Sequence, residues 1–226
     1  HDVARKAGVS QPTVSKVINQ YSGVSQTTRR KVLQAIEELG FTPDAIARSL
    51  VRSKSDTIGL IVGDIANPFY AETAKVVIRE AQTRGYETIV LDTDYDNDNF
   101  DKCLQTLMSK RVDGILVGSV TRFNEKVKEI YDSGFPIVLY NRNLDKKLVH
   151  CVEVDNETGT MLALRHLQEL GHRRIAYISG PINYSTFYSR YLGYMSGVHE
   201  LGLNPNHELV YNGVYEYDSV FEFARK

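Results

Sequence analysis

The sequence has few of the features that mark membrane, secreted or disulfide-stabilised proteins. Only two of its 226 residues are cysteines, Cys103 and Cys151, and neither has a CxxC partner. We expect both thiols to be reduced and structural. No apolar run approaches the ~18 residues needed to cross a bilayer, and no signal-peptide pattern opens the sequence. The sequence therefore predicts a cytoplasmic protein with no membrane partner.

The signatures of several enzyme classes are also missing. The sequence contains no G-x-S-x-G, no G-x-G-x-x-G and no phosphate-binding loop, and the serine of GYMSG at 193–197 stands one place too late for the first of these. The run DNDN at 96–99 is more typical of a turn and a helix cap than of a metal site. We therefore expect no enzyme, no catalytic residue, no cofactor and no metal.

Positive charge is concentrated near the start of the chain. Residues 1–54 carry nine Lys and Arg against four Asp and Glu, a net charge of +5, whereas residues 55–226 carry −6. The formal net charge of −1 hides this difference. A basic head on an acidic body indicates that a polyanion binds the head.

Residues 1–41 predict three short helices. The first has an apolar face and ends at Gly8, and the second begins at Ser10 with Pro12 in its first turn. The third follows Ser25 and ends at Gly40. Its predicted apolar face consists of Val32, Leu33, Ile36 and Leu39. Two short helices joined by a glycine-containing turn form a helix-turn-helix.

The second predicted helix, in VSQPTVSKVIN at 9–19, has two distinct faces. Val14, Val17 and Ile18 are expected to face a small core. The opposite face holds Gln11, Pro12, Ser15, Lys16 and Asn19. In a helix-turn-helix this helix lies in the major groove, where Gln pairs with adenine and Lys reaches guanine. Ser10, Thr13 and Arg29 suit phosphate contacts. The alternative is a merely solvated face.

Residues 42–56 predict a short linker helix. Its helix-forming part is too short to be stable alone, because an isolated helix needs ~12–15 residues. We expect it to become ordered with its partner. Leu50 and Val51 have no core to join, and minor-groove binders use such residues as wedges between base steps. The alternative is a tether that packs on the body.

From residue 57 onwards strand-like and helix-like segments alternate. The expected strands are 57–64, 87–94, 112–119, 135–142, 151–156 and 173–181, separated by helices that include 98–110, 123–133, 157–170 and 186–202. This order predicts a doubly wound parallel sheet. Ligands bind such sheets at the carboxyl ends of the strands. The polar groups expected there suit a small polar ligand: Asp64 to Tyr70, Asp92 to Tyr95, Ser119, Asn141–Arg142, Asp155 and Gly180–Pro181.

The motifs DVARKAGVS, TVSKVIN and AIEELGF, followed by IARSL, resemble the lactose-repressor (LacI/GalR) family of bacterial transcription regulators. The resemblance implies that Gln11, Pro12 and Lys16 contact bases. It places Thr13, Ser15 and Asn19 on the DNA backbone, and Ala47 and Leu50 in the minor groove. Two residues depart from the family pattern. Pro12 offers a base only apolar contact, and Asp44 puts a negative charge near phosphate.

The body resembles the same family through IGLIV, NPFY, RVDGILV, VDN and LGHRRIAYISGP. This implies a two-lobed fold like that of the periplasmic sugar-binding proteins, with a sugar or sugar phosphate as effector. An Arg fork such as that of Arg190 and a carboxylate such as that of Asp155 suit hydroxyl groups. The implied effector contacts are Asn67, Phe69, Tyr70, Arg142, Asp155, Tyr184, Thr186, Arg190 and Tyr215.

The predicted organisation is a helix-turn-helix domain at 1–41, a hinge at 42–56, a first lobe at 57–155 and a partial second lobe at 156–226. Because family members continue further, we expect a fragment that lacks the extreme N-terminus and a large C-terminal part, leaving the second lobe incomplete. The expected function is repression at a pseudo-palindromic double-stranded operator, by a homodimer. The alternatives are an enzyme on a doubly wound sheet and a transport solute-binding protein, which predicts an export signal and no basic head.

Overall fold

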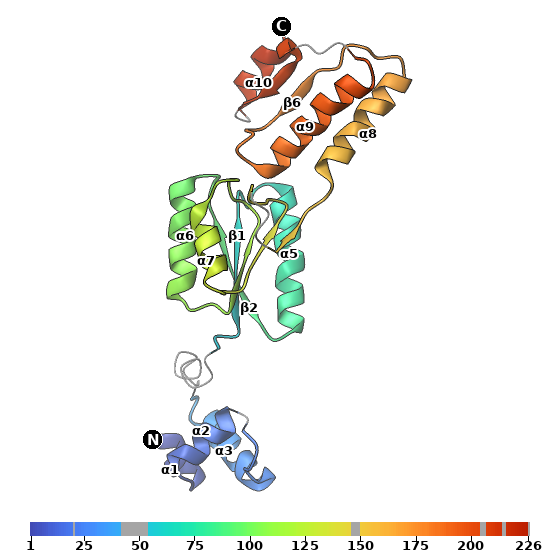
Figure 1. Cartoon of the computed structure of the whole chain (residues 1–226). Coiled ribbons are helices and arrows are strands. Elements are labelled where there is room, and N and C mark those ends of the chain that lie inside the picture. The colour runs from blue at the N-terminus through green and yellow to red at the C-terminus, as the bar shows by residue number, and fades with distance from the viewer. Residues whose placement is uncertain (20, 42–53, 146–149, 204–206, 214–215, 226) are drawn as a thin grey trace. The chain divides into compact units, whose positions relative to one another are not determined.

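The computed structural model describes residues 1–19, 21–41, 54–145, 150–203, 207–213 and 216–225 (Figure 1). The chain divides into two compact units, His1–Asp56 and Thr57–Lys226. The three-helix part of the first unit, residues 1–41, is called the head below. The second unit is called the body.

The head contains the three predicted helices: α1 (Asp2–Ala7), α2 (Gln11–Ile18) and α3 (Gln26–Glu38). Gly8 ends α1 in the left-handed conformation, with φ 64°. The side chains of Ser10 and Ser25 accept hydrogen bonds from Thr13 N–H and Thr28 N–H, which satisfies backbone donors that have no partner within the helix. The helix-turn-helix expectation is therefore confirmed.

A small core joins the three helices of the head. Its buried members are Val3, Val14, Val17, Val32 and Ala35. The prediction for α3 was partly wrong, because two leucines expected on the apolar face, Leu33 and Leu39, are 53% and 43% exposed. Leu33 lies about 100° around the helix from Val32, and Leu39 is the residue at which α3 ends.

The first part of the body is built on a five-stranded parallel sheet of order β2-β1-β3-β4-β5. The strands are β1 (Thr57–Val62), β2 (Glu87–Asp92), β3 (Gly114–Val117), β4 (Ile137–Tyr140) and β5 (Cys151–Val152). The connecting helices are α5 (Pro68–Thr83), α6 (Asn97–Ser109) and α7 (Glu125–Asp132). These elements are called the first lobe.

Helices cover both faces of this sheet. Helix α5 lies on one face and α6 and α7 on the other (Figure 1). Leu60 and Val62 of β1 pack with Tyr70 and Ala74 of α5, whereas Ile61 packs in the core that includes α6 and α7. Successive strand residues point to opposite faces, so a strand buried on both faces must be apolar throughout. The doubly wound parallel sheet is confirmed.

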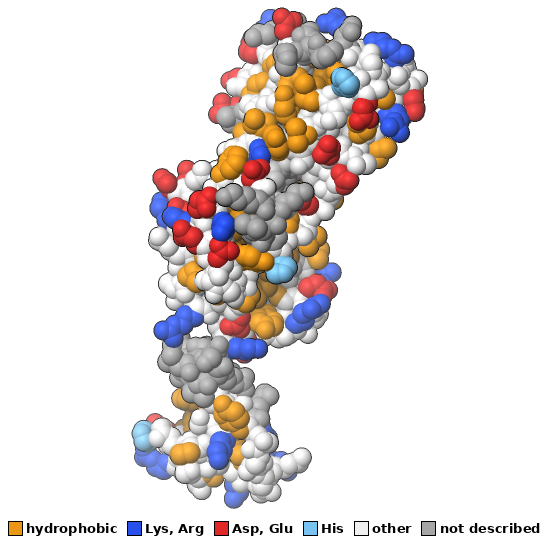
Figure 2. All heavy atoms as spheres, in the orientation of Figure 1, with side chains coloured by type: hydrophobic (Ala, Val, Ile, Leu, Met, Phe, Trp, Pro, Cys, Tyr) orange, Lys and Arg blue, Asp and Glu red, His pale blue; other side chains and the backbone are white. Residues whose placement is uncertain are grey.

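The remaining elements are called the second lobe. They are α8 (Asn156–Glu169), β6 (Tyr177–Ser179), α9 (Ser185–Glu200), the 3₁₀ helix η1 (His207–Leu209), β7 (Val210–Asn212) and α10 (Tyr217–Ala224). Strands β6 and β7 pair in parallel. Hydrophobic side chains gather on the visible face of this lobe (Figure 2), and Tyr217 and Phe221 of α10 are 79% and 46% exposed.

Helices α8 and α9 pack closely because α9 presents glycines to α8. A Cβ atom built on Gly193 would lie 2.5 Å from the carbonyl oxygen of Glu157, a distance that side-chain carbons do not adopt. Among the described residues, no helix is both long enough and apolar enough to cross a bilayer.

Candidate functional site

The exposed face of α2 presents a compact set of polar groups. Gln11, Pro12, Ser15 and Lys16 are all exposed, on the side of the helix opposite its buried valines. Their spacing places them on adjacent turns of one helix surface. The head also carries more Lys and Arg than acidic side chains on the face drawn in Figure 2. This surface has the donors, acceptors and charge that base edges and phosphates require.

The residues predicted to hold the DNA backbone lie at the ends of this surface. The Ser10 hydroxyl accepts from Thr13 N–H at 3.4 Å and lies 2.8 Å from the Thr13 hydroxyl, so both belong to the cap of α2. Arg29 donates from Nη2 to the carbonyl oxygen of Tyr21 at 3.2 Å. A guanidinium has further N–H groups available beyond that one bond.

Asn19 does not lie where the sequence placed it. We expected it on the exposed face of α2, but it is only 7% exposed, so that expectation is wrong. Asn19 follows the last turn of α2, and its Nδ2 donates to the Ser15 hydroxyl at 3.3 Å. This bond draws the amide back against the helix end.

Three predicted site residues lie outside the described residues: Ala47 and Leu50 of the hinge, and Tyr215 of the predicted effector set. Asp44 and the helix-forming part of the predicted linker also lie outside them.

In the body, aromatic side chains gather at the carboxyl edge of the five-stranded sheet. The ring centroids of Phe69 and Tyr70 are 5.2 Å apart, those of Tyr70 and Tyr95 are 6.3 Å apart, and those of Tyr95 and Tyr184 are 6.4 Å apart. The Tyr70 hydroxyl donates to the carbonyl oxygen of Gly118 at 3.1 Å. The structure thus brings together three predicted effector residues and adds Tyr95, which the sequence placed at this edge but not in the effector set.

Asn67 forms hydrogen bonds with two of the residues that carry these rings, Phe69 and Tyr95. It is the N-cap of α5, and its side-chain oxygen accepts from Phe69 N–H at 3.0 Å. Its Nδ2 donates to the Tyr95 hydroxyl at 3.3 Å, which links the start of α5 to the loop after β2. Asn67 therefore orders the aromatic groups as well as lying among them.

Arg142 lies two residues beyond the end of β4 and is only 5% exposed. Its guanidinium carbon lies 4.6 Å from the centre of the Tyr184 ring and 4.5 Å from that of Phe187. Asn141, the residue before it, has φ 61°, so the chain turns sharply at the end of the strand. Asn adopts this left-handed conformation more readily than most residues. The turn and the two rings together fix Arg142 at the sheet edge.

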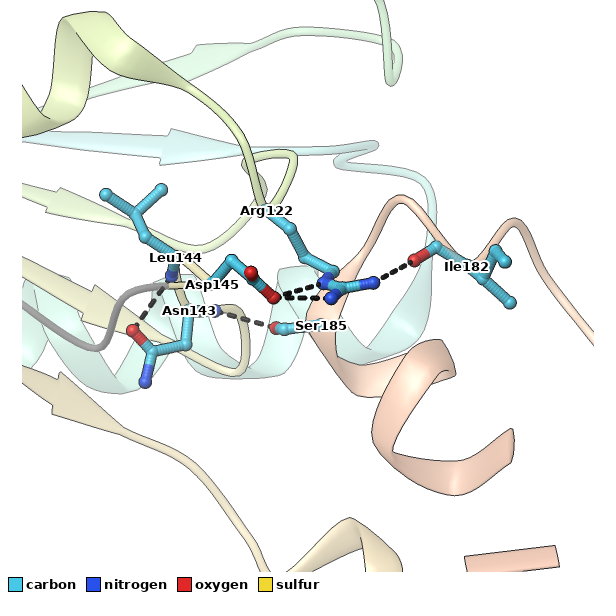
Figure 3. Close-up of polar contacts among 6 residues, drawn as sticks. All are labelled: Arg122, Asn143, Leu144, Asp145, Ile182 and Ser185. Atoms are coloured by element: carbon cyan, nitrogen blue, oxygen red, sulfur yellow. Dashed lines mark hydrogen bonds and ion pairs between the residues drawn. The ribbon is translucent and has the colours of Figure 1, made fainter. Parts of the chain in front are cut away.

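The start of α9 is bonded to the first lobe at several points (Figure 3). Asn143 N–H donates to the Ser185 hydroxyl at 2.7 Å, and Thr186 Oγ1 donates to the carbonyl oxygen of Asn141. Tyr184 OH donates to the carbonyl oxygen of Tyr95 at 3.3 Å. Two predicted effector residues, Tyr184 and Thr186, therefore also hold the lobes together.

Arg122 is the most connected side chain of this junction. It forms an ion pair with Asp145, donates from Nη1 to the carbonyl oxygen of Ile182 at 3.1 Å, and lies with its guanidinium carbon 3.5 Å from the centre of the Tyr188 ring (Figure 3). Arg122 is not among the predicted site residues. A basic residue that follows a central strand can have many roles, so its position in the sequence does not identify its partners. The partners of Arg122 lie close to it only in the folded protein.

Asp155 and Arg190 each have a structural partner within the second lobe. Asp155 is the N-cap of α8, where its two carboxylate oxygens accept from Thr158 N–H at 2.9 Å and from Thr158 Oγ1 at 2.8 Å. These bonds lower the pKa of the Asp155 carboxyl. Arg190 Nε donates to Asn156 Oδ1 at 2.8 Å. Both side chains are exposed, so both can also contact a ligand. The Arg190 guanidinium has N–H groups beyond the one bonded to Asn156, and the Asp155 oxygens can accept further hydrogen bonds.

Burial changes the pKa values of two tyrosine hydroxyls at the sheet edge, those of Tyr184 and Tyr95. Burial raises the pKa of Tyr184 above its ordinary value, an effect that the nearby Arg142 charge opposes, and burial likewise raises the pKa of Tyr95. Asp96 caps α6 by accepting from Asn99 N–H at 2.7 Å, as expected for the DNDN run. The edge therefore offers hydroxyl, amide and guanidinium groups between aromatic rings, which suits a polar organic ligand.

Comparison with known proteins gives two family matches. Residues 1–44 match the model for bacterial regulatory proteins of the lacI family. Residues 55–224 match the model for periplasmic binding proteins and the sugar-binding domain of the LacI family.

Individual relatives extend over the whole chain. Catabolite control protein A of Priestia megaterium is 36% identical over 230 residues, and the ribose operon repressor of Escherichia coli K12 is 35% identical over 227 residues. Each alignment covers 100% of this chain and 68% of the relative.

Two solved structures are similar over nearly the whole chain. The lac repressor dimer bound to operator and the anti-inducer ONPF matches with a TM-score of 0.81 and 26% identity, covering 98% of this chain and 67% of that one. The CelR–cellobiose complex matches with a TM-score of 0.67 and 32% identity, covering 99% of this chain and 68% of that one.

Proposed function

Because the chain belongs to the LacI family of bacterial regulatory proteins, we propose that it represses transcription by binding a DNA operator under the control of a small polar effector. The observation that carries this function is the exposed face of α2, with Gln11, Ser15 and Lys16 on one surface of a capped helix in a basic head. A helix of this kind fits the major groove.

Each predicted DNA contact has a proposed role. Gln11 and Lys16 contact base edges, and Pro12 makes apolar contact, for example with a thymine methyl group. Ser10, Thr13, Ser15 and Arg29 contact phosphates. Asn19 reaches the backbone only if its amide leaves the Ser15 hydroxyl, which makes it the least accessible of the set. Ala47 and Leu50 are proposed to enter the minor groove from the hinge.

The proposed effector site lies at the carboxyl edge of the five-stranded sheet. It uses the predicted residues Asn67, Phe69, Tyr70, Arg142, Asp155, Tyr184, Thr186, Arg190 and Tyr215. One relative is a ribose operon repressor and one structural neighbour is a cellobiose complex, which supports a sugar or a sugar phosphate as the effector.

The bonds between the two lobes suggest how the effector acts. Two of the proposed effector residues, Tyr184 and Thr186, lie at the start of α9 and form hydrogen bonds with the first lobe. A ligand held there therefore changes the balance between lobe arrangements. A ligand shifts such a balance only by the difference between its affinities for the two arrangements.

The remaining parts of the proposal follow from the family. We propose domains at 1–41, 42–56, 57–155 and 156–226, and a homodimer that presents two heads to a pseudo-palindromic operator. The lac repressor dimer bound to its operator supports this arrangement. The protein is proposed to act in the cytoplasm and to have no enzymatic activity.

Fluorescence anisotropy tests the function. The chain is titrated onto a pseudo-palindromic duplex with a central CG step, at two salt concentrations, with a duplex of altered half-site spacing as control. Preference for the intact palindrome, with affinity falling steeply as salt rises, is the expected result. Equal weak binding to both duplexes would reduce the head to an electrostatic anchor and refute the proposal.

A further inference from the structure

The Arg142 guanidinium is a buried charge without a counter-ion. Among the described residues it is the only charged side chain in the buried class, at 5% exposure. None of the ion pairs between described residues includes Arg142, and its Nε and Nη1 atoms are buried without a hydrogen-bond partner. Burying an unpaired charge costs free energy, so a protein retains one where a ligand completes it.

A neighbouring arginine, Arg122, shows that this junction can provide an ion pair and a hydrogen bond for a guanidinium. Arg122 lies in the same junction, yet it pairs with Asp145 and donates to the carbonyl oxygen of Ile182. The other buried polar side chains beside Arg142 are also bonded, since Asn143 donates to Glu153 and Ser185 accepts from Asn143 N–H. Among the described residues, Arg142 is therefore the only buried charged side chain, and two of its nitrogens have no hydrogen-bond partner.

Two features keep the Arg142 charge in place without neutralising it. The rings of Tyr184 and Phe187 face the guanidinium at 4.6 and 4.5 Å, which offsets part of the desolvation cost. Three carboxylates of this region have other partners: Asp64 accepts from Ala66 N–H, Asp96 caps α6, and Glu153 accepts from Asn143 Nδ2. Among the described residues, the Arg142 charge therefore has no counter-ion.

The start of α9 adds to the same positive field. Helices α5, α6, α7 and α8 of the body each begin with a side chain that caps the helix, whereas α9 and α10 have no such cap. Helix α9 has 16 residues, and its first turn is the part that contacts Arg142. The positive end of a helix dipole favours an anion.

We propose that Arg142 and the first turn of α9 form an anion subsite, and that the effector carries a phosphate or carboxylate group bound there. The inference rests on the proposed effector site and narrows its ligand class, because a neutral sugar leaves the charge uncompensated. Nε and Nη1 supply two donors to the anionic oxygens, and charge-assisted hydrogen bonds of this kind are stronger than neutral ones.

Isothermal titration of the full 226-residue chain with inorganic phosphate tests the subsite. The titration is repeated with acetate, with chloride at matched ionic strength, and with neutral glucose. Saturable phosphate binding is expected, and Arg142→Gln should weaken it at least tenfold. Arg165→Gln, an exposed arginine on α8, serves as the matched control and should change the affinity less than twofold. Tighter binding of phosphate than of acetate identifies the anionic group as a phosphate; the reverse order identifies a carboxylate.

A second variant covers the case in which Arg142→Gln does not fold. Arg142→Lys keeps the charge but not the guanidinium donors, and it should bind the anion three- to tenfold more weakly. Phosphate affinity equal in wild type and in the folded Arg142 variants would overturn the inference, as would an equal loss in Arg165→Gln or no phosphate binding at all.

Operator titration of the same preparations separates the two proposals. A chain that selects the operator but does not bind phosphate through Arg142 keeps the proposed function and loses the anion subsite. A chain that binds phosphate through Arg142 but does not select the operator loses the proposed function and keeps the subsite.

Discussion

Replacing Arg122 by alanine should destabilise the body through the junction between its lobes. The side chain is only 11% exposed and forms an ion pair, a hydrogen bond to a backbone carbonyl and a ring contact. A hydrogen bond involving a charged group contributes about 1.5–3 kcal/mol, and a cation–π contact about 0.5–2 kcal/mol. Asp145 is 47% exposed, so solvent screens the ion pair and limits its share to about 1 kcal/mol or less.

The expected loss in the free energy of unfolding is therefore about 2–4 kcal/mol, because the contributions are not additive. Urea unfolding followed by far-UV circular dichroism measures it. The matched control is Arg84→Ala, whose ion pair with Glu80 spans 3.8 Å at an exposed site and should cost about 0.5 kcal/mol or less. If Arg122→Ala costs no more than Arg84→Ala, the junction does not hold the lobes as described.

Four further outcomes are expected. Lys16→Ala should cost about 1–3 kcal/mol on the preferred operator and relax specificity at one base pair, measured by anisotropy. Ser25→Ala removes the cap of α3 and should cost the head about 1 kcal/mol in thermal unfolding. Gly193→Ala drives a methyl group into the Glu157 carbonyl and should cost about 1–3 kcal/mol in urea unfolding. Burial raises the pKa of Tyr184 in the folded state above the ordinary tyrosine pKa of 10.0. The stability that the protonated hydroxyl contributes is therefore fully present below pH 10 and is lost as the pH rises through the folded-state pKa. Tyr184→Phe should reduce this loss of stability at alkaline pH.

Each of these outcomes has a clear contradiction. An equal loss on scrambled DNA would make Lys16 a phosphate contact. Ser22 is exposed and caps no helix, so Ser22→Ala should leave the thermal stability of the head unchanged. If Ser25→Ala changes that stability no more than Ser22→Ala does, Ser25 does not stabilise α3 as a cap. An unchanged midpoint in Gly193→Ala would show that α8 and α9 move apart freely. A pH profile unaffected by Tyr184→Phe would place the alkaline loss elsewhere.

The elements of the fold were predictable because each has a local signal. Ser10, Ser25 and Asp96 mark helix starts through their own side-chain chemistry, and Gly8 marks a helix end. The buried strands were visible as apolar runs. Boundaries were less accurate: the run at 151–156 forms only the two-residue strand β5, because pairing with β4 ends there.

The arrangement of side chains within the sites was less predictable. Asn19 turns inwards because its amide finds the Ser15 hydroxyl one turn back, a choice that helical spacing alone does not settle. Arg122 and Phe187 were missed because their partners lie far away in the sequence: Arg122 meets Ile182, and Phe187 meets Arg142. Contacts of this range depend on how the lobes meet, which no local pattern encodes.

The left-handed backbone conformation of Asn141 sets the direction in which the Arg142 side chain leaves the chain. A substitution at position 141 can therefore change that direction. Glycine or aspartate at position 141 tolerates φ 61°, whereas a β-branched residue there would cost about 1–2 kcal/mol and tend to straighten the chain beyond β4. A straightened chain would carry the guanidinium away from its two rings while leaving its own chemistry unchanged. The orientation of the Arg142 guanidinium can therefore change through substitutions at position 141, with Arg142 itself unchanged.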